Sequence, residues 1–335
     1  MSTCKQTCLE NLNHALIDLA KQDEKIIFLG EDIKEPYGGA FKVEKNFSTL
    51  FPDRVISTPI SEEGFSGFAA GLAIQGYKPI VDFMFSDFMT LSFDMIINFL
   101  SKYPQMYGRN LPLSMVLRSA NGGYRGYGAT HSQSMQKFFM GIPNIYVFEM
   151  SPFHDNKLVF EQMFAKNKTC IFFEEKKLYN TPVYINNEQN IFKLTHLGKG
   201  KNWAHLSTGA STPACTILCP GGITPLVLGA AEELLLNYEI ETDILVPSQL
   251  YPCEMLDIMH ILQASQHILV VEESTPGINF GSHILEELSK LAEDKTLLSK
   301  IKLLSSRNSV IPANINLEKQ ILVGQQDILD AVLAI

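Results

Sequence analysis

The chain has 335 residues, of which 46% are hydrophobic and only 19% are charged, a composition that suits about two domains with a well-filled core or a large buried interface. Its net charge is −9, and its basic residues are outnumbered and form no runs, so nucleic-acid binding is not expected. No stretch of about 18 apolar residues occurs, and residues 1–16 lack the apolar core of a signal peptide. We therefore expect a cytoplasmic protein with no membrane span.

The cysteines do not predict a metal site. Their spacings include two close pairs, but no second ligand pair completes a zinc-binding pattern, so we expect reduced, mostly buried thiols and no bound metal in this chain. The six are Cys4, Cys8, Cys170, Cys215, Cys219 and Cys253.

Apolar runs and amphipathic stretches alternate through the first half of the chain. In chain order they predict a helix at about 9–19, strands at 25–30 and 78–85 separated by a helix at 63–76, a helix interrupted near Pro104, a strand at 111–118, and strands at 144–150 and 169–175 separated by a helix at about 155–166. Strands that alternate with helices favour an α/β fold with a mostly parallel sheet and helices on both faces.

A polar stretch without periodicity, 185–212, separates this half from a second one. We expect domains at 1–190 and 213–335, joined by a linker at 191–212. The second domain repeats the alternation on a smaller scale, with strands predicted at 215–222, 241–250, 266–274 and 299–306 and helices at 223–237, 253–265 and 281–294.

Chemically active side chains follow several predicted strands of the first half. They lie in the segments 30–32, 58–63, 85–88 and 118–134, the last of which is glycine-rich and contains His131. Because ligands bind at the carboxyl ends of parallel strands, these segments are candidates to converge on one pocket.

The adjacent carboxylates Glu62 and Glu63 have two possible roles. They stand where a helix begins, in "TPISEEGFSG", and acidic pairs there most often remain solvated and complement the helix dipole. The other possibility is that one of the two turns inward to a ligand.

Four segments resemble a known family. The runs "FLGED", "FPDRVISTPISEEGFSGFAAGLAIQG", "ANGGYRGYGATHSQS" and "VVEESTPGINFGSHILEEL" resemble the β subunits of thiamine-diphosphate-dependent 2-oxoacid dehydrogenases, the transketolase-like E1β chains of the pyruvate and branched-chain type. The resemblance covers almost the whole chain. It implies a pyrimidine-binding domain followed by a transketolase C-terminal domain.

The resemblance also implies residue roles. Glu62, and not Glu63, would bond N1′ of the cofactor's aminopyrimidine and relay a proton, which requires shielding from water. Phe88 would pack on the pyrimidine ring, and Glu31 and Ile60 would add cofactor contacts. A flat apolar face suits an aromatic heterocycle.

His131 would be the second catalytic residue. The resemblance puts it at the substrate end of the pocket, in a loop that Arg118, Ser132 and Gln133 support. Glycines allow a backbone to approach a ligand closely, and histidine can change its protonation near neutral pH.

The family's diphosphate and Mg²⁺ motif, GDG with a later Asn, is absent from this sequence. The resemblance therefore implies an E1α partner that holds the Mg²⁺, in an α2β2 heterotetramer. The assembly would oxidatively decarboxylate a 2-oxoacid and pass the acyl group to lipoamide on an E2 transacylase. Two alternatives stay open: a β subunit of an acetoin dehydrogenase or of another acyl- or ketol-transferring enzyme, and a non-catalytic partner-binding paralogue.

Overall fold

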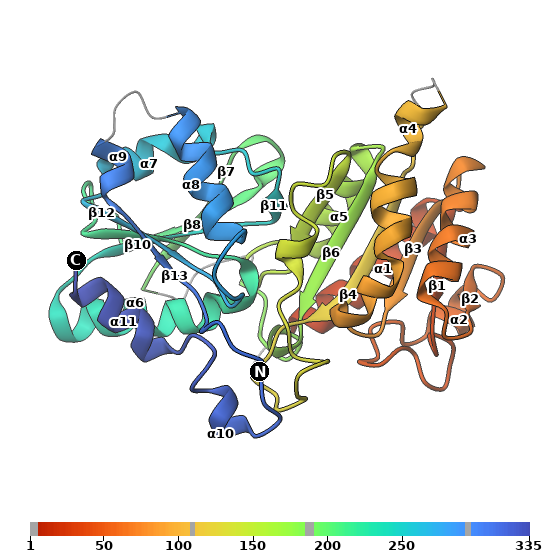
Figure 1. Cartoon of the computed structure of the whole chain (residues 1–335), viewed down its shortest axis with the longest axis horizontal. Helices are drawn as coiled ribbons and strands as arrows, with labels where there is room; N and C mark the ends of the chain where they lie inside the picture. Colours follow the sequence, from red (N-terminus) through yellow and green to blue (C-terminus); the bar gives the residue numbers. More distant parts are fainter. Residues whose placement is uncertain (1–5, 108–110, 185–190, 292–295) are drawn as a thin grey trace, which may run out of the picture. The chain divides into compact units, whose positions relative to one another are not determined.

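The computed structural model describes residues 6–107, 111–184, 191–291 and 296–335, which form two compact units (Figure 1). The glycine-rich loop lies in the first half of the sequence but belongs to the second unit. The first unit comprises Met1–Asn121, Phe139–Met150 and Asp155–Val183, and the second comprises Gly122–Phe138, Ser151–His154 and Tyr184–Ile335.

The strands of the first unit pair in parallel, as the sequence predicts, and their order in the sheet is β5-β6-β4-β3-β1-β2. They are β1 (Ile26–Gly30), β2 (Val55–Ser57), β3 (Lys78–Phe83), β4 (Met115–Asn121), β5 (Ile145–Glu149) and β6 (Thr169–Glu175). Strand β4 starts later than predicted and runs on to the glycine-rich loop.

Helices connect these strands. They are α1 (Cys8–Gln22), α2 (Phe47–Leu50), α3 (Glu62–Ile74), α4 (Tyr103–Met106) and α5 (Asn156–Ala165), with shorter or irregular turns η1 (Ser86–Ser92), η2 (Met95–Leu100) and η4 (Lys176–Leu178). The helix predicted around Pro104 is divided between η2, a π-helical segment, and α4.

Alternate residues of the strands face opposite layers of helices. Phe28 and the residues that share its sheet face in the other strands, among them Val55, Ile80 and Val116, belong to a core cluster with buried residues of α1 and α5. Phe83 faces the other way, and its ring centroid lies 5.1 Å from that of Phe65 in α3. Because side chains alternate along a strand, α3 covers the sheet face opposite to α1 and α5.

The second unit contains a mixed sheet in the order β13-β12-β9-β10-β8-β7, in which the first four strands are parallel and β8 and β7 are antiparallel. The strands of this unit are β7 (Lys193–Leu197), β8 (Trp203–Ser207), β9 (Cys215–Leu218), β10 (Thr242–Pro247), β11 (Gln249–Tyr251), β12 (His267–Val271) and β13 (Ile301–Leu304).

Helices α6 and α11 pack together on this sheet, and their apolar residues share a core cluster with β9, β10 and β12. The helices of the unit are α6 (Thr224–Tyr238), α7 (Met259–Ala264), α8 (Phe280–Leu291), α9 (Thr296–Ser299), α10 (Ile315–Glu318) and α11 (Gln325–Leu333), with turns η3 (Gln136–Phe138), η5 (Lys199–Lys201), η6 (Gly221–Ile223) and η7 (Leu256–Ile258).

The stretch interpreted as a linker, 191–212, contains the hairpin β7–β8. Its polar composition has a structural reason: β7 is the edge strand of the mixed sheet, and its five residues are exposed or only half-buried. An edge strand with solvent access loses the apolar run by which a buried strand is recognised.

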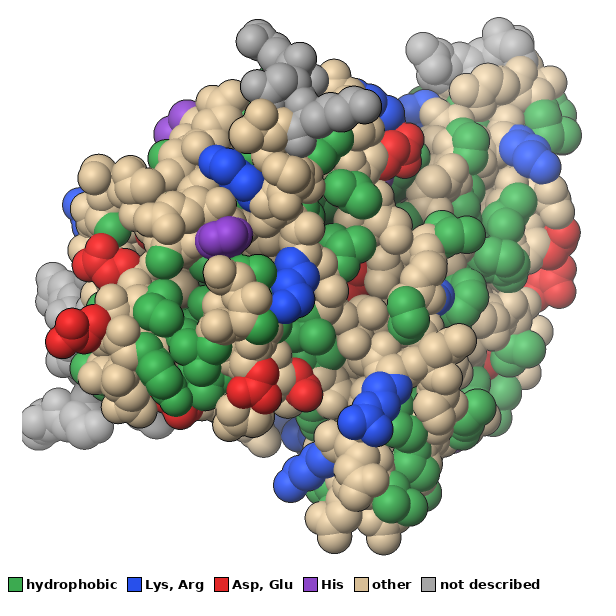
Figure 2. Space-filling view, turned by 60° about the vertical axis from the view of Figure 1, so that its left-hand side comes forward, with side chains coloured by type: hydrophobic (Ala, Val, Ile, Leu, Met, Phe, Trp, Pro, Cys, Tyr) green, Lys and Arg blue, Asp and Glu red, His purple; other side chains and the backbone are tan. Residues whose placement is uncertain are grey.

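On the face drawn in Figure 2, Lys and Arg side chains lie singly or in small groups among hydrophobic and neutral ones. Within the described ranges, no helix combines the length and the apolar character needed to span a bilayer. The thiols of Cys8, Cys170, Cys215 and Cys253 are buried and unbridged, while Cys4 lies outside the described residues.

Candidate functional site

The carboxyl ends of β1, β2 and β3 meet at one edge of the first sheet. Gly30, the last residue of β1, is in register with Ser57 of β2 and with Asp82 of β3. The backbone N–H of Thr58 donates to the carbonyl of Gly30 at 2.9 Å. The segments that follow these strands therefore start side by side, as expected from the parallel pairing.

Helix α3 turns one of the two adjacent carboxylates inward. It begins at Glu62, which is 7% exposed, whereas Glu63 is exposed. Phe65 and Ala69 are also buried, and residues three and seven positions apart lie on one helical face. The amphipathic period of α3 thus carries Glu62 toward the sheet and Glu63 toward solvent.

Glu31 is the neighbour of Glu62 at this edge. Burial, together with the charges of Glu62 and Asp32, raises the pKa of Glu31 to about 7. Its Oε1 atom is buried and, among the residues described, has no hydrogen-bond partner; the same holds for Oγ1 of Thr58. A buried polar atom left unpaired is costly, so this edge suits a ligand with hydrogen-bonding groups.

Aromatic side chains follow β3. Phe88 in η1 is half-buried, and its ring packs edge-to-face on that of Phe85, with centroids 6.0 Å apart. The hydroxyls of Ser66 and Ser92 are 2.9 Å apart and connect α3 to η1. Ile60 is 81% exposed, so the contact expected of it with the cofactor stays a prediction.

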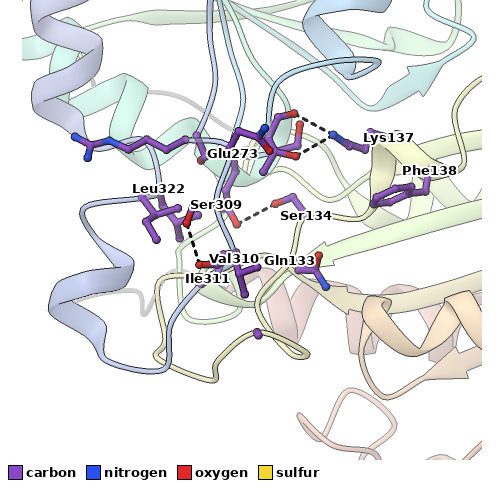
Figure 3. Close-up of a pocket in the computed structure, with 16 residues that line it drawn as sticks. Gln133, Ser134, Lys137, Phe138, Glu273, Ser309, Val310, Ile311 and Leu322 are labelled. Carbon is purple, nitrogen blue, oxygen red and sulfur yellow. Dashed lines mark hydrogen bonds between the residues drawn. The ribbon is translucent and has the colours of Figure 1, made fainter.

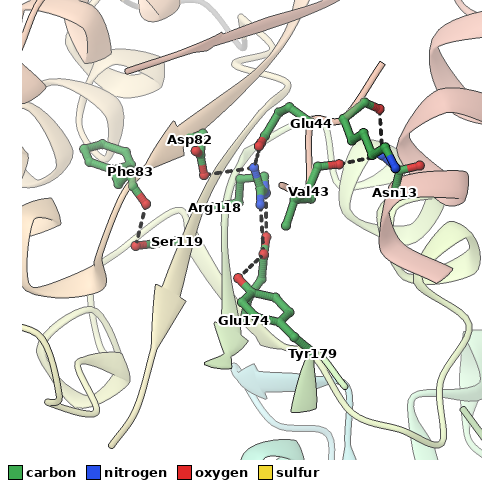
Figure 4. A network of polar contacts seen from close by, with 10 residues as sticks. Asn13, Val43, Glu44, Asp82, Phe83, Arg118, Ser119, Glu174 and Tyr179 are labelled. Atoms are coloured by element: carbon green, nitrogen blue, oxygen red, sulfur yellow. Dashed lines mark hydrogen bonds and ion pairs between the residues drawn. The ribbon is translucent and has the colours of Figure 1, made fainter. Parts of the chain in front are cut away.

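Arg118 lies inside the first unit, within β4, and its side chain is 2% exposed (Figure 4). Its guanidinium donates two hydrogen bonds to Glu174, from Nε to Oε1 and from Nη2 to Oε2, the second at 2.8 Å. It also pairs with Asp82 and Glu44. The phenol of Tyr179 donates to the same Glu174 at 2.9 Å.

The carboxylates around Arg118 outnumber it. Burial and the charges of Glu174 and Glu31 raise the pKa of Asp82. The contacts of Arg118 described here all connect parts of the first unit, so the support of the glycine-rich loop by this residue stays a prediction.

The loop that contains His131 belongs to the second unit and is closed at its neck. The N–H of Gly122 donates to the carbonyl of Gln133 at 3.2 Å. His131 donates from its backbone to Gly128 at 3.2 Å, and its Nδ1 lies 2.9 Å from Oγ1 of Thr130. The imidazole is half-buried.

The two neighbours predicted to support His131 differ in environment. Ser132 is fully buried, and its Oγ has no hydrogen-bond partner among the described residues. Gln133 has an exposed side chain and contributes its carbonyl to the neck of the loop.

The structure brings Glu31 and Glu62 together and sets Phe88 after β3, whereas His131, Ser132 and Gln133 belong to the other unit. Sequence reasoning missed the buried carboxylates that organise these parts. A signal existed for Asp82, Glu174 and Glu273, because these acids stand within or just after otherwise apolar strand patterns, whereas Glu44 in a turn and Glu318 in α10 carry no such signal. Within the described ranges, no three His, Cys, Asp or Glu side chains are grouped to hold a metal ion.

Comparison with protein families defines the class. Residues 5–182 match the pyrimidine-binding domain of transketolase, and residues 207–328 match the transketolase C-terminal domain. The chain therefore belongs to the transketolase family and has both of these domains, which confirms the fold class and the family resemblance.

Among curated proteins, the chain is 29% identical over 324 residues to the pyruvate dehydrogenase E1 component subunit beta of Cyanidium caldarium, covering 96% of this chain and 95% of that one. The same subunit of Rickettsia felis is 29% identical, with 97% of both chains covered. A solved structure, a split-gene transketolase described as an inactive beta4 tetramer, superposes with a TM-score of 0.75 at 19% identity over 98% of each chain and supports the fold.

Proposed function

We propose that this chain is the β subunit of a 2-oxoacid dehydrogenase E1 component and that it binds thiamine diphosphate jointly with an α subunit. The observation that carries the proposal is the buried pair of Glu31 and Glu62 at the carboxyl edge of the first sheet. Pyruvate dehydrogenase E1β relatives that align over nearly their whole length support the same assignment.

The residues at this edge fit the aminopyrimidine of the cofactor. The ring nitrogen N1′ accepts a hydrogen bond, and two buried neighbouring carboxylates can together retain a proton near neutral pH and donate it. Phe88 offers an apolar ring for stacking. The unpaired Oε1 of Glu31 leaves an acceptor for an N–H or O–H group of a ligand.

Thiamine diphosphate, when bound, supplies the electron sink for cleaving the bond between the carboxylate and the carbonyl carbon of a 2-oxoacid. Glu62 holds a proton at N1′ and can return it. Glu31, whose pKa is near 7, lets the pair change its proton content within the working pH range. Burial of both carboxylates excludes competing water.

We assign the substrate end to His131. Its imidazole orients or protonates the substrate, and the 2.9 Å contact of Nδ1 with Thr130 restricts the ring. The acyl acceptor in this proposal is lipoamide on an E2 transacylase, and the α subunit holds Mg²⁺ and the diphosphate, because this chain lacks the motif for them.

Co-expression with the E1α chain tests the proposal. The pair should copurify as α2β2, bind thiamine diphosphate in calorimetry only when both chains are present, and decarboxylate at least one 2-oxoacid with an artificial electron acceptor. Tight Mg²⁺-dependent cofactor binding by this chain alone would contradict the shared site. Activity on acetoin without activity on any 2-oxoacid would favour the acetoin dehydrogenase alternative.

A further inference from the structure

We infer that the C-terminal segment 311–323, through Glu318, together with Glu273 after β12, positions the loop 122–134 that presents His131. Glu273 and Glu318 are positioning residues in this inference: they contact the loop backbone and act through His131. The inference rests on the proposed function for the role of His131, whereas the contacts themselves stand on the structure.

Glu318 holds the start of the loop. Its Oε1 accepts from the backbone N–H of Tyr124 at 3.0 Å, and its Oε2 accepts from that of Gly126 at 2.9 Å. A carboxylate that accepts two amide hydrogens makes charge-assisted bonds, which are stronger than neutral ones. Each of its oxygens therefore has a defined partner in the loop.

The exposure pattern of α10 shows that Glu318 is directed at the loop. The side chain of Glu318 is 0% exposed, while the apolar neighbours Ile315 and Leu317 are 45% and 49% exposed. A short surface helix that buries its acid and exposes its apolar residues reverses the usual pattern. Such reversals mark positions where function overrides folding preference.

Glu273 ties the two ends of the loop together. Its Oε1 accepts from the N–H of Gly123 at 2.6 Å and from the hydroxyl of Ser134 at 2.9 Å. The second of these bonds is drawn in Figure 3. With the backbone bond of Gly122 to Gln133, these contacts close the neck of the loop.

Two further contacts complete the attachment to the C-terminal segment. The phenol of Tyr124 donates to the carbonyl of Val323 at 2.6 Å. Gly126 has a φ of +69°, and a side chain there would meet the carbonyl of Ala313 at 3.1 Å. Glycine at this position therefore favours the close approach of the two backbones.

The second half of the loop borders a cavity. The cavity, of about 480 Å³, separates this half from the loops that follow β12 and β13, with Gln133 and Lys137 on one side and Val310 and Ile311 on the other (Figure 3). Polar contacts, including those of the Lys137 ammonium with Thr275 at 2.9 Å and with the carbonyl of Gly277 at 3.2 Å, span this region. Polar contacts therefore connect the loop and the turn after it to the segments around this cavity.

Two substitutions at Glu318 and one matched control test the inference. Glu318→Ala removes both acceptors, whereas Glu318→Gln keeps the size of the side chain and one uncharged acceptor, which controls for a failure to fold. Glu232→Gln, an exposed carboxylate on α6 in the same unit, is the control. The proteins are the full chain, alone and paired with E1α.

Hydrogen exchange and proteolysis measure how well the loop is held, and neither needs a cofactor. We expect faster exchange of the Tyr124 and Gly126 amides and faster tryptic cleavage after Arg125 in the order Ala, Gln, wild type, with the control equal to wild type. Unchanged exchange and cleavage in Glu318→Ala would overturn the inference that Glu318 holds the loop.

Kinetic measurements on the pair with E1α test whether the position of the loop affects turnover. Turnover should fall roughly 10- to 100-fold in Glu318→Ala, because small misplacements of a reacting group cost that much. Exchange of the cofactor's C2 proton, which depends on Glu62, should be largely retained. A loosened loop with normal turnover would overturn the positioning role. An inactive wild-type pair would overturn the proposed function instead. The amide hydrogen-exchange data would still decide whether Glu318 holds the loop.

Discussion

Glu31 and Glu62 lie beside each other at the carboxyl edge of the first sheet, where burial and the charge of Glu62 help raise the pKa of Glu31 to about 7. Neither carboxylate has a cation as its partner in the contacts described here. The buried guanidinium of Arg118 is instead paired with Asp82, Glu44 and Glu174. The edge thus keeps an acidic pair without a cation, next to a buried network in which three carboxylates share one guanidinium and the pKa of Asp82 is raised.

Glu62→Gln should keep the fold and abolish decarboxylation, with a loss of roughly 10²–10⁴ in rate or more, because an amide cannot exchange the proton that the carboxylate relays. C2 proton exchange and single-turnover decarboxylation measure the effect. Glu63→Gln is the matched control, since that adjacent carboxylate is exposed, and it should behave as wild type. Full activity in Glu62→Gln would refute the assignment.

Glu31→Gln should make the protein more stable than wild type at alkaline pH. The pKa of Glu31 is raised from 4.5 to about 7 in the folded state, so its stabilising contribution is complete below pH 4.5 and is lost as the pH rises through 7. The advantage of the variant should therefore grow between these values and level off above them, at about 1 kcal/mol after solvent screening.

Urea unfolding at pH 4.5 and at pH 8 measures this difference for Glu31→Gln. The turnover of the paired enzyme should also lose its dependence on a group that titrates near neutrality. An advantage that is equal at both pH values would show that Glu31 does not titrate between them.

Arg118→Met should destabilise the first unit by about 3–5 kcal/mol, because the substitution leaves buried carboxylates without their cation. Arg118→Lys should also be destabilising, since an ammonium cannot fork onto Glu174 with two nitrogens. Chemical denaturation gives the values. Lys21→Met, at the exposed end of α1, is the control and should stay within about 0.5 kcal/mol of wild type. A loss of unfolding free energy no larger than that of the control would contradict the role of Arg118 as the cation that neutralises these buried carboxylates.

His131→Ala should lower turnover by roughly 10²–10⁴ while C2 proton exchange is largely retained, because an acid–base or orienting group at the substrate end acts after cofactor activation. His260→Ala, an exposed histidine of α7, is the control. If proton exchange fell as far as turnover in His131→Ala, the histidine would belong to the activation machinery or to the fold.

Much of the fold can be read from local patterns. The parallel strands β1, β3 and β6 and the helices α3 and α5 lie close to the predicted ranges, because continuous apolar runs and a 3.6-residue period are local signals. The hairpin β7–β8 escaped prediction because an edge strand shares its exposure with a loop. The position of Glu62 in the family motif was enough to predict which of Glu62 and Glu63 turns inward, and the burial of Glu62 agrees with it.

The sequence by itself determined the α/β class, the two transketolase domains and the identity of the acid that α3 buries. The tertiary structure alone decided the partners of the buried charges. Glu318 bonds the backbone of Tyr124 across 194 residues, and Arg118 meets Glu44 across 74 and Glu174 across 56. Such contacts leave no periodic trace, because their spacing in the chain is set by the path of the backbone and not by the geometry of any single helix or strand.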